Sequence, residues 1–101
     1  MKANKLNLEN ALHLASILSK YVDIETSLEK SAFEFVDEII QKISPEEYLR
    51  CISLITNEDT EDIIKEESID LLALFTEGLV LNTVATLLEF YKKLKNGNPK
   101  Q

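Results

Sequence analysis

The feature that most constrains this chain is its scarcity of helix breakers. Two Gly and two Pro occur in 101 residues, at positions 45, 78, 97 and 99. Because both residue types disfavour helix interiors, the intervening stretches are free to be helical. Apolar residues recur there at steps of three and four, the period of an amphipathic helix. The sequence therefore predicts an all-α fold, a compact bundle of about five to six short helices.

Composition limits the functional classes. Eighteen acidic and eleven basic residues give a net charge of -7, which repels nucleic-acid phosphates, so no nucleic-acid partner is expected. One Cys excludes an internal disulfide, and one Cys with one His leaves no usual zinc site. We therefore expect no metal and no cofactor. Asp70 and Glu77 interrupt the most apolar window, 69–88, which favours a buried helix over a membrane span.

The first ten residues lack the apolar core of a secretory signal, so a cytoplasmic location is expected. The first helix is predicted over residues 8–22, about four turns, with Asn7 as its N-cap. Leu14, Ile17 and Tyr21 widen its apolar arc beyond what one supporting surface needs. This helix is therefore expected to pack on two sides.

The second helix is predicted from Thr26, which has capping-box spacing to Glu29, as far as Ile43. Its acidic side is expected to face solvent. The residues predicted for its inner stripe are Leu28, Ala32, Phe35, Val36, Ile39 and Ile43, and those predicted for its outer face are Glu34, Asp37, Glu38 and Gln41.

The sharpest local signal is Ser44-Pro45-Glu46-Glu47, which predicts the start of a third helix. The Ser44 hydroxyl is placed to accept the first free amide, and Pro45 has no amide to leave unpaired. The Glu47 carboxylate is placed to reach back and complete a capping box. The side chains expected to point inward are Tyr48, Cys51, Ile52 and Ile55, with Leu49 and Leu54 on the flanks.

The acidic segment 57–60 reads as a loop, after which Thr60 is a candidate cap for a short helix. Ser68 is a candidate cap for a helix over 69–81 that is apolar on all sides. Such a helix belongs in the centre of a bundle or in an interface. Gly78 is compatible with a left-handed end to this helix and with a close crossing inside it, and both readings stay open.

The last helix is predicted from Asn82 or Thr83 to Leu94. The basic residues 96–101 are expected to be a flexible tail after a single domain over 1–95. Lysines gather in this last part of the chain, whereas acids dominate 57–90. The two could meet within one molecule or between copies, or each could simply be a solvated surface.

No catalytic residue is predicted. His13 and Ser16 are helical neighbours, but nothing supplies a third member or an oxyanion hole. Cys51 is expected to pack as a small apolar side chain. The acidic run 58–62 lacks the alternation and central Gly of a calcium loop. We therefore expect a non-enzymatic protein.

The helices carry more apolar surface than a core of about 13 Å radius must hide. Part of it is therefore expected to be an interface, including one between copies in a homo-oligomer. The alternative is that all of it closes one monomer core. The candidate interface positions are Leu14, Ile17 and Tyr21 on the first helix, and Phe75, Leu79, Phe90 and Tyr91 near the end.

The second half of the chain also shows a succession of segments that is similar to one in a known protein family. The segments are Ile43-Ser44-Pro45-Glu46-Glu47-Tyr48-Leu49, Ile52-Ser53-Leu54-Ile55-Thr56, acidic 57–62, apolar 71–82, and Leu87-Leu88-Glu89-Phe90-Tyr91. This succession resembles the small tail assembly chaperones of long-tailed bacteriophages and prophages. The resemblance covers about residues 43–94 and extends only loosely to the first helix.

The resemblance implies a helical, self-associating protein of the host cytoplasm. It implies that the chain binds the tape measure protein, keeps it soluble, and gives way as tail tube protein polymerises. The family has no catalytic set to carry over. The partner-binding residues predicted from apolar placement are Leu14, Tyr21, Phe75, Leu79, Leu87, Phe90 and Tyr91.

A second hypothesis needs only the apolar surplus and not the resemblance. A small helical regulator or adaptor that docks a bacterial or prophage protein would show the same wide apolar faces.

Overall fold

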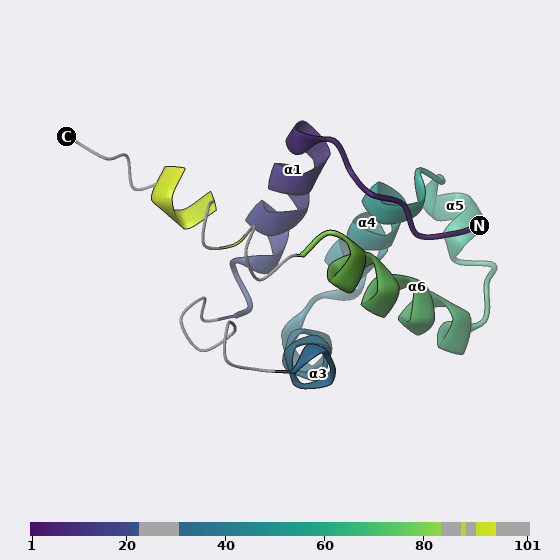
Figure 1. Ribbon diagram of the computed structural model, residues 1–101. Helices are drawn as coiled ribbons and strands as arrows, with labels where there is room; N and C mark the ends of the chain where they lie inside the picture. Colours follow the sequence, from purple (N-terminus) through teal and green to yellow (C-terminus); the bar gives the residue numbers. More distant parts are fainter. Residues whose placement is uncertain (23–30, 84–87, 89–90, 95–101) are drawn as a thin grey trace.

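The computed structural model describes residues 1–22, 31–83, 88 and 91–94 of the chain (Figure 1). This part is all-α, as predicted, and contains no strand. Residues 91–94 are also helical. The helices are α1 (Leu8–Leu18), α3 (Ala32–Lys42), α4 (Pro45–Thr56), α5 (Thr60–Ile63) and α6 (Ser68–Leu81).

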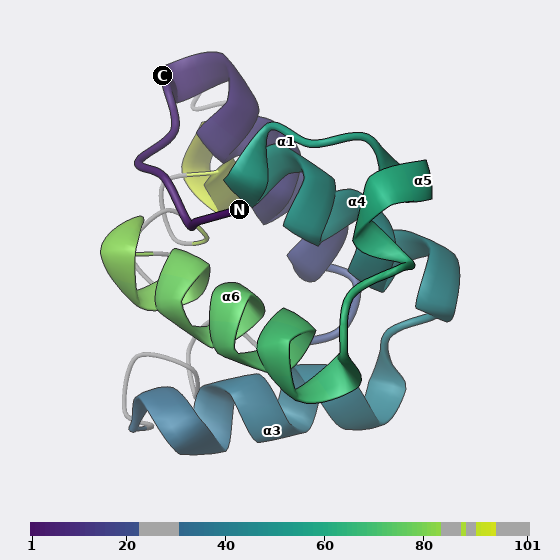
Figure 2. The same ribbon diagram turned by 90° about the vertical axis from the view of Figure 1, so that its right-hand side faces the viewer.

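Helices α4 and α6 pack against each other and hold the other elements together (Figure 2). Helix α1 packs on α4, and α3 packs on α6, where it lies below α6 in Figure 2. Each of these helices contributes side chains to one apolar core. Even the short α5 adds Ile63, and the C-terminal segment adds Leu88. The largest side chains that are fully buried there are Phe75, Leu14, Leu18, Ile39, Ile52, Ile55, Ile63 and Leu88.

Two of the predicted N-caps are confirmed. The Asn7 side chain accepts a hydrogen bond of 2.9 Å from the Asn10 amide at the start of α1. The Ser44 hydroxyl accepts one of 3.2 Å from the Glu47 amide, and Pro45 occupies the first position of α4. In both cases a side-chain oxygen satisfies an amide that the helix itself leaves unpaired.

The predicted start of the second helix is wrong. Helix α3 begins at Ala32, because Ser31 has an extended backbone and caps it. The Ser31 hydroxyl accepts from the Glu34 amide, and the Glu34 carboxylate accepts from the Ser31 amide. This complete capping box ends any continuous helix at residue 31. The weaker box predicted at 26–29 lies outside the described residues.

Other boundaries differ by a few residues. Helix α1 ends at Leu18, where 8–22 was predicted. Ser68 and Thr60 are the first residues of α6 and α5, and neither is the cap. The caps are Glu67 and Asp59, whose side chains make no capping hydrogen bond. The predicted tail at 96–101 lies outside the described residues.

Gly78 lies inside α6 at its crossing with α4, which decides between the two readings of this residue. It is buried, and a Cβ added to it would lie 2.5 Å from Cγ2 of Ile55. No two carbon atoms that are not bonded approach so closely. Gly is therefore required here because the α4 side chain occupies the space that any larger residue would need.

Asn82 caps the end of α6 and ties it to the N-terminal segment, where the sequence had suggested the start of another helix. Its side-chain oxygen accepts from the Leu6 amide at 2.8 Å, and its side-chain nitrogen donates to the carbonyls of Asn4 and Gly78. The backbone N–H of Asn4 also donates to the Ile55 carbonyl at 3.0 Å. Residues 1–7 are thus fastened over the crossing of α4 and α6.

We predict that Gly78→Ala destabilises the protein by about 1–3 kcal/mol, as overpacking of a core does. The intrinsic helix preference of Ala offsets part of this cost. Urea unfolding measures the change. In an Ile55→Ala background the same substitution should cost less, because Ala lacks the Cγ1, Cγ2 and Cδ1 atoms that the new Cβ would meet. Equal costs in both backgrounds would contradict this account.

We predict that Asn82→Ala lowers the free energy of unfolding by about 1–3 kcal/mol, because it leaves partly buried backbone groups unpaired. Hydrogen exchange distinguishes loss of these particular hydrogen bonds from destabilisation of the whole fold. The Leu6 amide should lose protection far more than the core amides of α4. Asn10→Ala is the matched control, because the Asn10 side chain makes no hydrogen bond within the described residues. Unchanged exchange at Leu6 would refute the fastening role.

Candidate interaction surface

Helix α6 has apolar side chains both on the side that is buried and on the side that faces solvent. Leu71, Phe75 and Leu79 point into the core, whereas Ile69 is 69% exposed and Val80 is 58% exposed. Leu72 lies beside Ile69 at helical spacing and is 37% exposed. Because apolar residues are spread around most of α6, the helix leaves apolar side chains in solvent beside Asp70 and Glu77.

Part of this exposed side forms the wall of a groove, which we call the α3–α6 groove. It is a hollow of about 350 Å³ between the C-terminal end of α3, the first turn of α4 and the first turns of α6. Its lining is almost entirely apolar. The lining residues are Ile40, Ile43, Tyr48, Ser68, Ile69 and Leu72.

Tyr48 links the groove to the core. Its ring meets that of Phe75 edge-on, with 5.1 Å between ring centres, and Phe75 is fully buried. Burial raises the pKa of the Tyr48 hydroxyl, which has no hydrogen-bond partner among the described residues. The groove therefore has a firm floor, because Tyr48 is held by packing.

The helices that form the groove carry more acidic than basic residues. Helix α6 carries Asp70 and Glu77 and no basic residue, and Glu67 precedes it. On α3, Asp37 is exposed one turn before Ile40. The outer face predicted for this helix is confirmed, since Glu34, Asp37 and Gln41 are exposed and Glu38 is half-buried.

The structure corrects the expectation that Leu14, Phe75 and Leu79 form an exposed partner surface. Leu14 and Phe75 are fully buried in the core, and Leu79 is 3% exposed. Ile17, which was predicted beside them, is buried too. The wide arc of α1 lies in this chain's own core, where α1 packs on α4.

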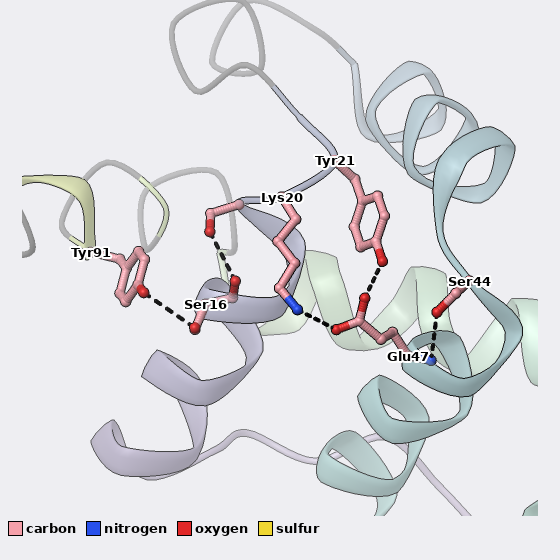
Figure 3. A network of polar contacts seen from close by, with 7 residues as sticks. Ser16, Lys20, Tyr21, Ser44, Glu47 and Tyr91 are labelled. Carbon is pink, nitrogen blue, oxygen red and sulfur yellow. Dashed lines mark hydrogen bonds and ion pairs between the residues drawn. The ribbon is translucent and has the colours of Figure 1, made fainter.

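Tyr21 and Tyr91, also predicted to bind a partner, are half-buried and hydrogen-bonded within the chain (Figure 3). The Tyr21 hydroxyl donates to the Glu47 carboxylate, and the Tyr91 hydroxyl donates to Ser16 at 3.2 Å. The remaining two predicted residues, Leu87 and Phe90, lie outside the described residues. None of the predicted residues lines the groove.

The groove residues Ile40, Ile69 and Leu72 were missed by sequence reasoning, although the sequence contains a signal for them. Ile39 and Ile40 are adjacent, so a helix cannot bury both on one narrow face. Likewise, α6 has more apolar residues than the one face of a helix that packs on the core can hold. Which of them remain outside depends on how α3 and α6 pack, and the periodicity alone does not contain that information.

Glu47 joins the end of α1 to the start of α4 (Figure 3). Its carboxylate binds the Lys20 ammonium at 2.6 Å as well as the Tyr21 hydroxyl. The predicted capping box is therefore incomplete, because Glu47 contacts α1 and not the Ser44 amide. The hydrogen bond from Lys20 is the main cause of a lowered pKa for Glu47, and the same bond raises the pKa of Lys20.

The residues considered for catalysis form no catalytic arrangement in the described structure. His13 and Ser16 line a second hollow of about 470 Å³ between α1 and α4, but no hydrogen bond joins them. Cys51 is buried, and burial raises the pKa of its thiol to about 12, so the thiolate that reactivity requires is absent at neutral pH. Its predicted packing role is confirmed.

Within the described ranges, no three metal-ligating side chains lie close enough together to hold an ion. The helices of that part of the chain are all too short or too polar to cross a bilayer. Comparison with models of known families, with curated proteins and with solved structures found no match. The case for function therefore depends on the residues themselves.

We predict that the Glu47 contacts make stability depend on pH. A carboxylate whose pKa is lowered by folding stabilises the fold above its unfolded pKa, and this contribution is lost as the pH falls through the folded pKa. Lys20, whose pKa is raised, stabilises below its unfolded pKa and loses its contribution as the pH rises through the folded pKa.

Glu47→Gln should accordingly flatten the acid side of the profile of urea midpoint against pH. Glu46→Gln is the matched control, because Glu46 also lies in the first turn of α4 but has no ionic partner among the described residues. An acid-side profile that is the same in both variants would refute the role given to Glu47.

Proposed function

We propose that this protein is a non-enzymatic assembly chaperone of the kind found in long-tailed phages and prophages. In this proposal it binds the tape measure protein in the cytoplasm of the bacterial host and keeps it soluble until tail tube protein assembles around it. The observation that carries the proposal is the α3–α6 groove, where a strongly acidic chain keeps apolar side chains in solvent. The resemblance of residues 43–94 supplies the class of client.

The chemistry of the groove suits a chaperone that binds without catalysis. Its apolar lining matches the exposed stripe of an amphipathic helix, which is how helical clients are held in a groove. Large apolar patches on soluble proteins commonly mark such contacts. The net charge of -7 would keep chaperone–client complexes apart by repulsion. Self-association, also implied by the resemblance, is part of the proposal.

Co-expression with the tape measure protein of a neighbouring phage gene tests this function. We expect the client to move from the insoluble to the soluble fraction and to co-purify with the chain. A client that stays insoluble, with nothing co-purifying, would refute the proposal. The regulator or adaptor hypothesis predicts a different result, namely retention of a specific bacterial protein from a host lysate that contains no phage protein.

A further inference from the structure

We infer that the α3–α6 groove binds a basic amphipathic helix, one whose apolar stripe is bordered by Lys or Arg. This deepens the proposed function, on which it rests, by stating which helices of a client the protein can hold. Two independent properties of the described residues support it, the shape and lining of the groove and the charge around it.

The lining calls for an apolar stripe on the partner. Ile69 and Leu72 form one wall, and Ile40 with Ile43 forms the other. Phe33, which is 82% exposed, lies two turns before Ile40 on the same side of α3 and is a second exposed apolar side chain there. The volume of about 350 Å³ suits the anchoring side chains of a helix laid across it, not a whole helix.

The charge around the groove calls for bases beside that stripe. Asp37 lies one turn from Ile40 on the same side of α3, and α6 carries no basic residue. The two nearby lysines are already used within the chain, since Lys42 pairs with Glu38 at 3.3 Å and Lys65 pairs with Asp62 at 4.0 Å.

The same charges argue against other occupants. An acidic helix would place its carboxylates against these carboxylates, and like charges brought together at an interface are costly. A second copy docked face to face would bring two acidic chains together, since each carries a net charge of -7. The basic amphipathic helix is the occupant that satisfies both properties.

Two synthetic peptides test the inference on the full-length chain. Both carry Leu at the i, i+3 and i+7 positions of a helix, and they differ only in having Lys or Glu at the bordering positions. Fluorescence anisotropy should show the Lys peptide binding at least about tenfold more tightly than the Glu peptide at low salt. Raising the salt to about 0.5 M should reduce this preference, because salt screens exposed charges.

Variants locate the site. Ile69→Ser with Leu72→Ser should weaken the Lys peptide about tenfold or more, because both substitutions remove apolar lining. Val80→Ser is the matched control, since Val80 is exposed on the same helix but does not line the groove. Asp37→Asn should reduce the preference for Lys over Glu and leave the fold intact, which circular dichroism confirms.

Each result supports or overturns the inference. Equal binding of both peptides, binding of neither, or loss of binding in Val80→Ser alone would overturn it. A dimer that forms in light scattering and is abolished by the double Ser variant would also overturn it, because the occupant would be a second copy. If the Lys peptide binds as expected but the tape measure client stays insoluble, only the proposed function fails. If the client also stays soluble with the double Ser variant, the proposed chaperone function still holds, but the groove is not where the client binds and this inference is refuted.

Discussion

The close crossing of α4 and α6 at Gly78 determines which face of the protein is available to a partner. Because Gly78 has no side chain, the Ile55 side chain of α4 fits directly against α6, whose Leu71, Phe75 and Leu79 are turned inward. The exposed side of α6 carries Ile69, Leu72 and Val80 as well as Asp70 and Glu77, so apolar side chains remain in solvent. The groove thus follows from one glycine and from the excess of apolar residues on a single helix.

Glu47 shows how a tertiary contact can displace a local one. Its position three residues after Ser44 fits a capping box, and the backbone half of that box forms. The carboxylate nevertheless contacts Lys20 and Tyr21, where it joins two helices. The spacing of Ser44 and Glu47 makes a capping-box contact possible. The position of α1 beside α4 offers Glu47 the alternative contacts that form instead. The opposite outcome occurs at Ser31, where Glu34 completes the box.

The sequence predicted most of the fold because the signals for it are local. Periodicity gave the buried residues of α4, and side-chain caps gave the starts of α1 and α4. The start of α3 was placed wrongly because a second capping signal, at Ser31, follows the first within a few residues. The partner surface was placed wrongly for a different reason. Leu14 and Phe75 are as apolar as Ile69, and only packing separates those inside from those outside.

An apolar groove in a small protein would ordinarily favour association of the protein with itself. Here the carboxylates beside the groove oppose the most direct form of that association, because two copies meeting through this face would confront acid with acid. The same carboxylates do not oppose a partner that brings lysines. Repulsion of the wrong occupant is an established way to obtain specificity when the attractive contacts are merely apolar. The acidity of α3 and α6 would then select the occupant, while Ile69 and Leu72 provide the affinity.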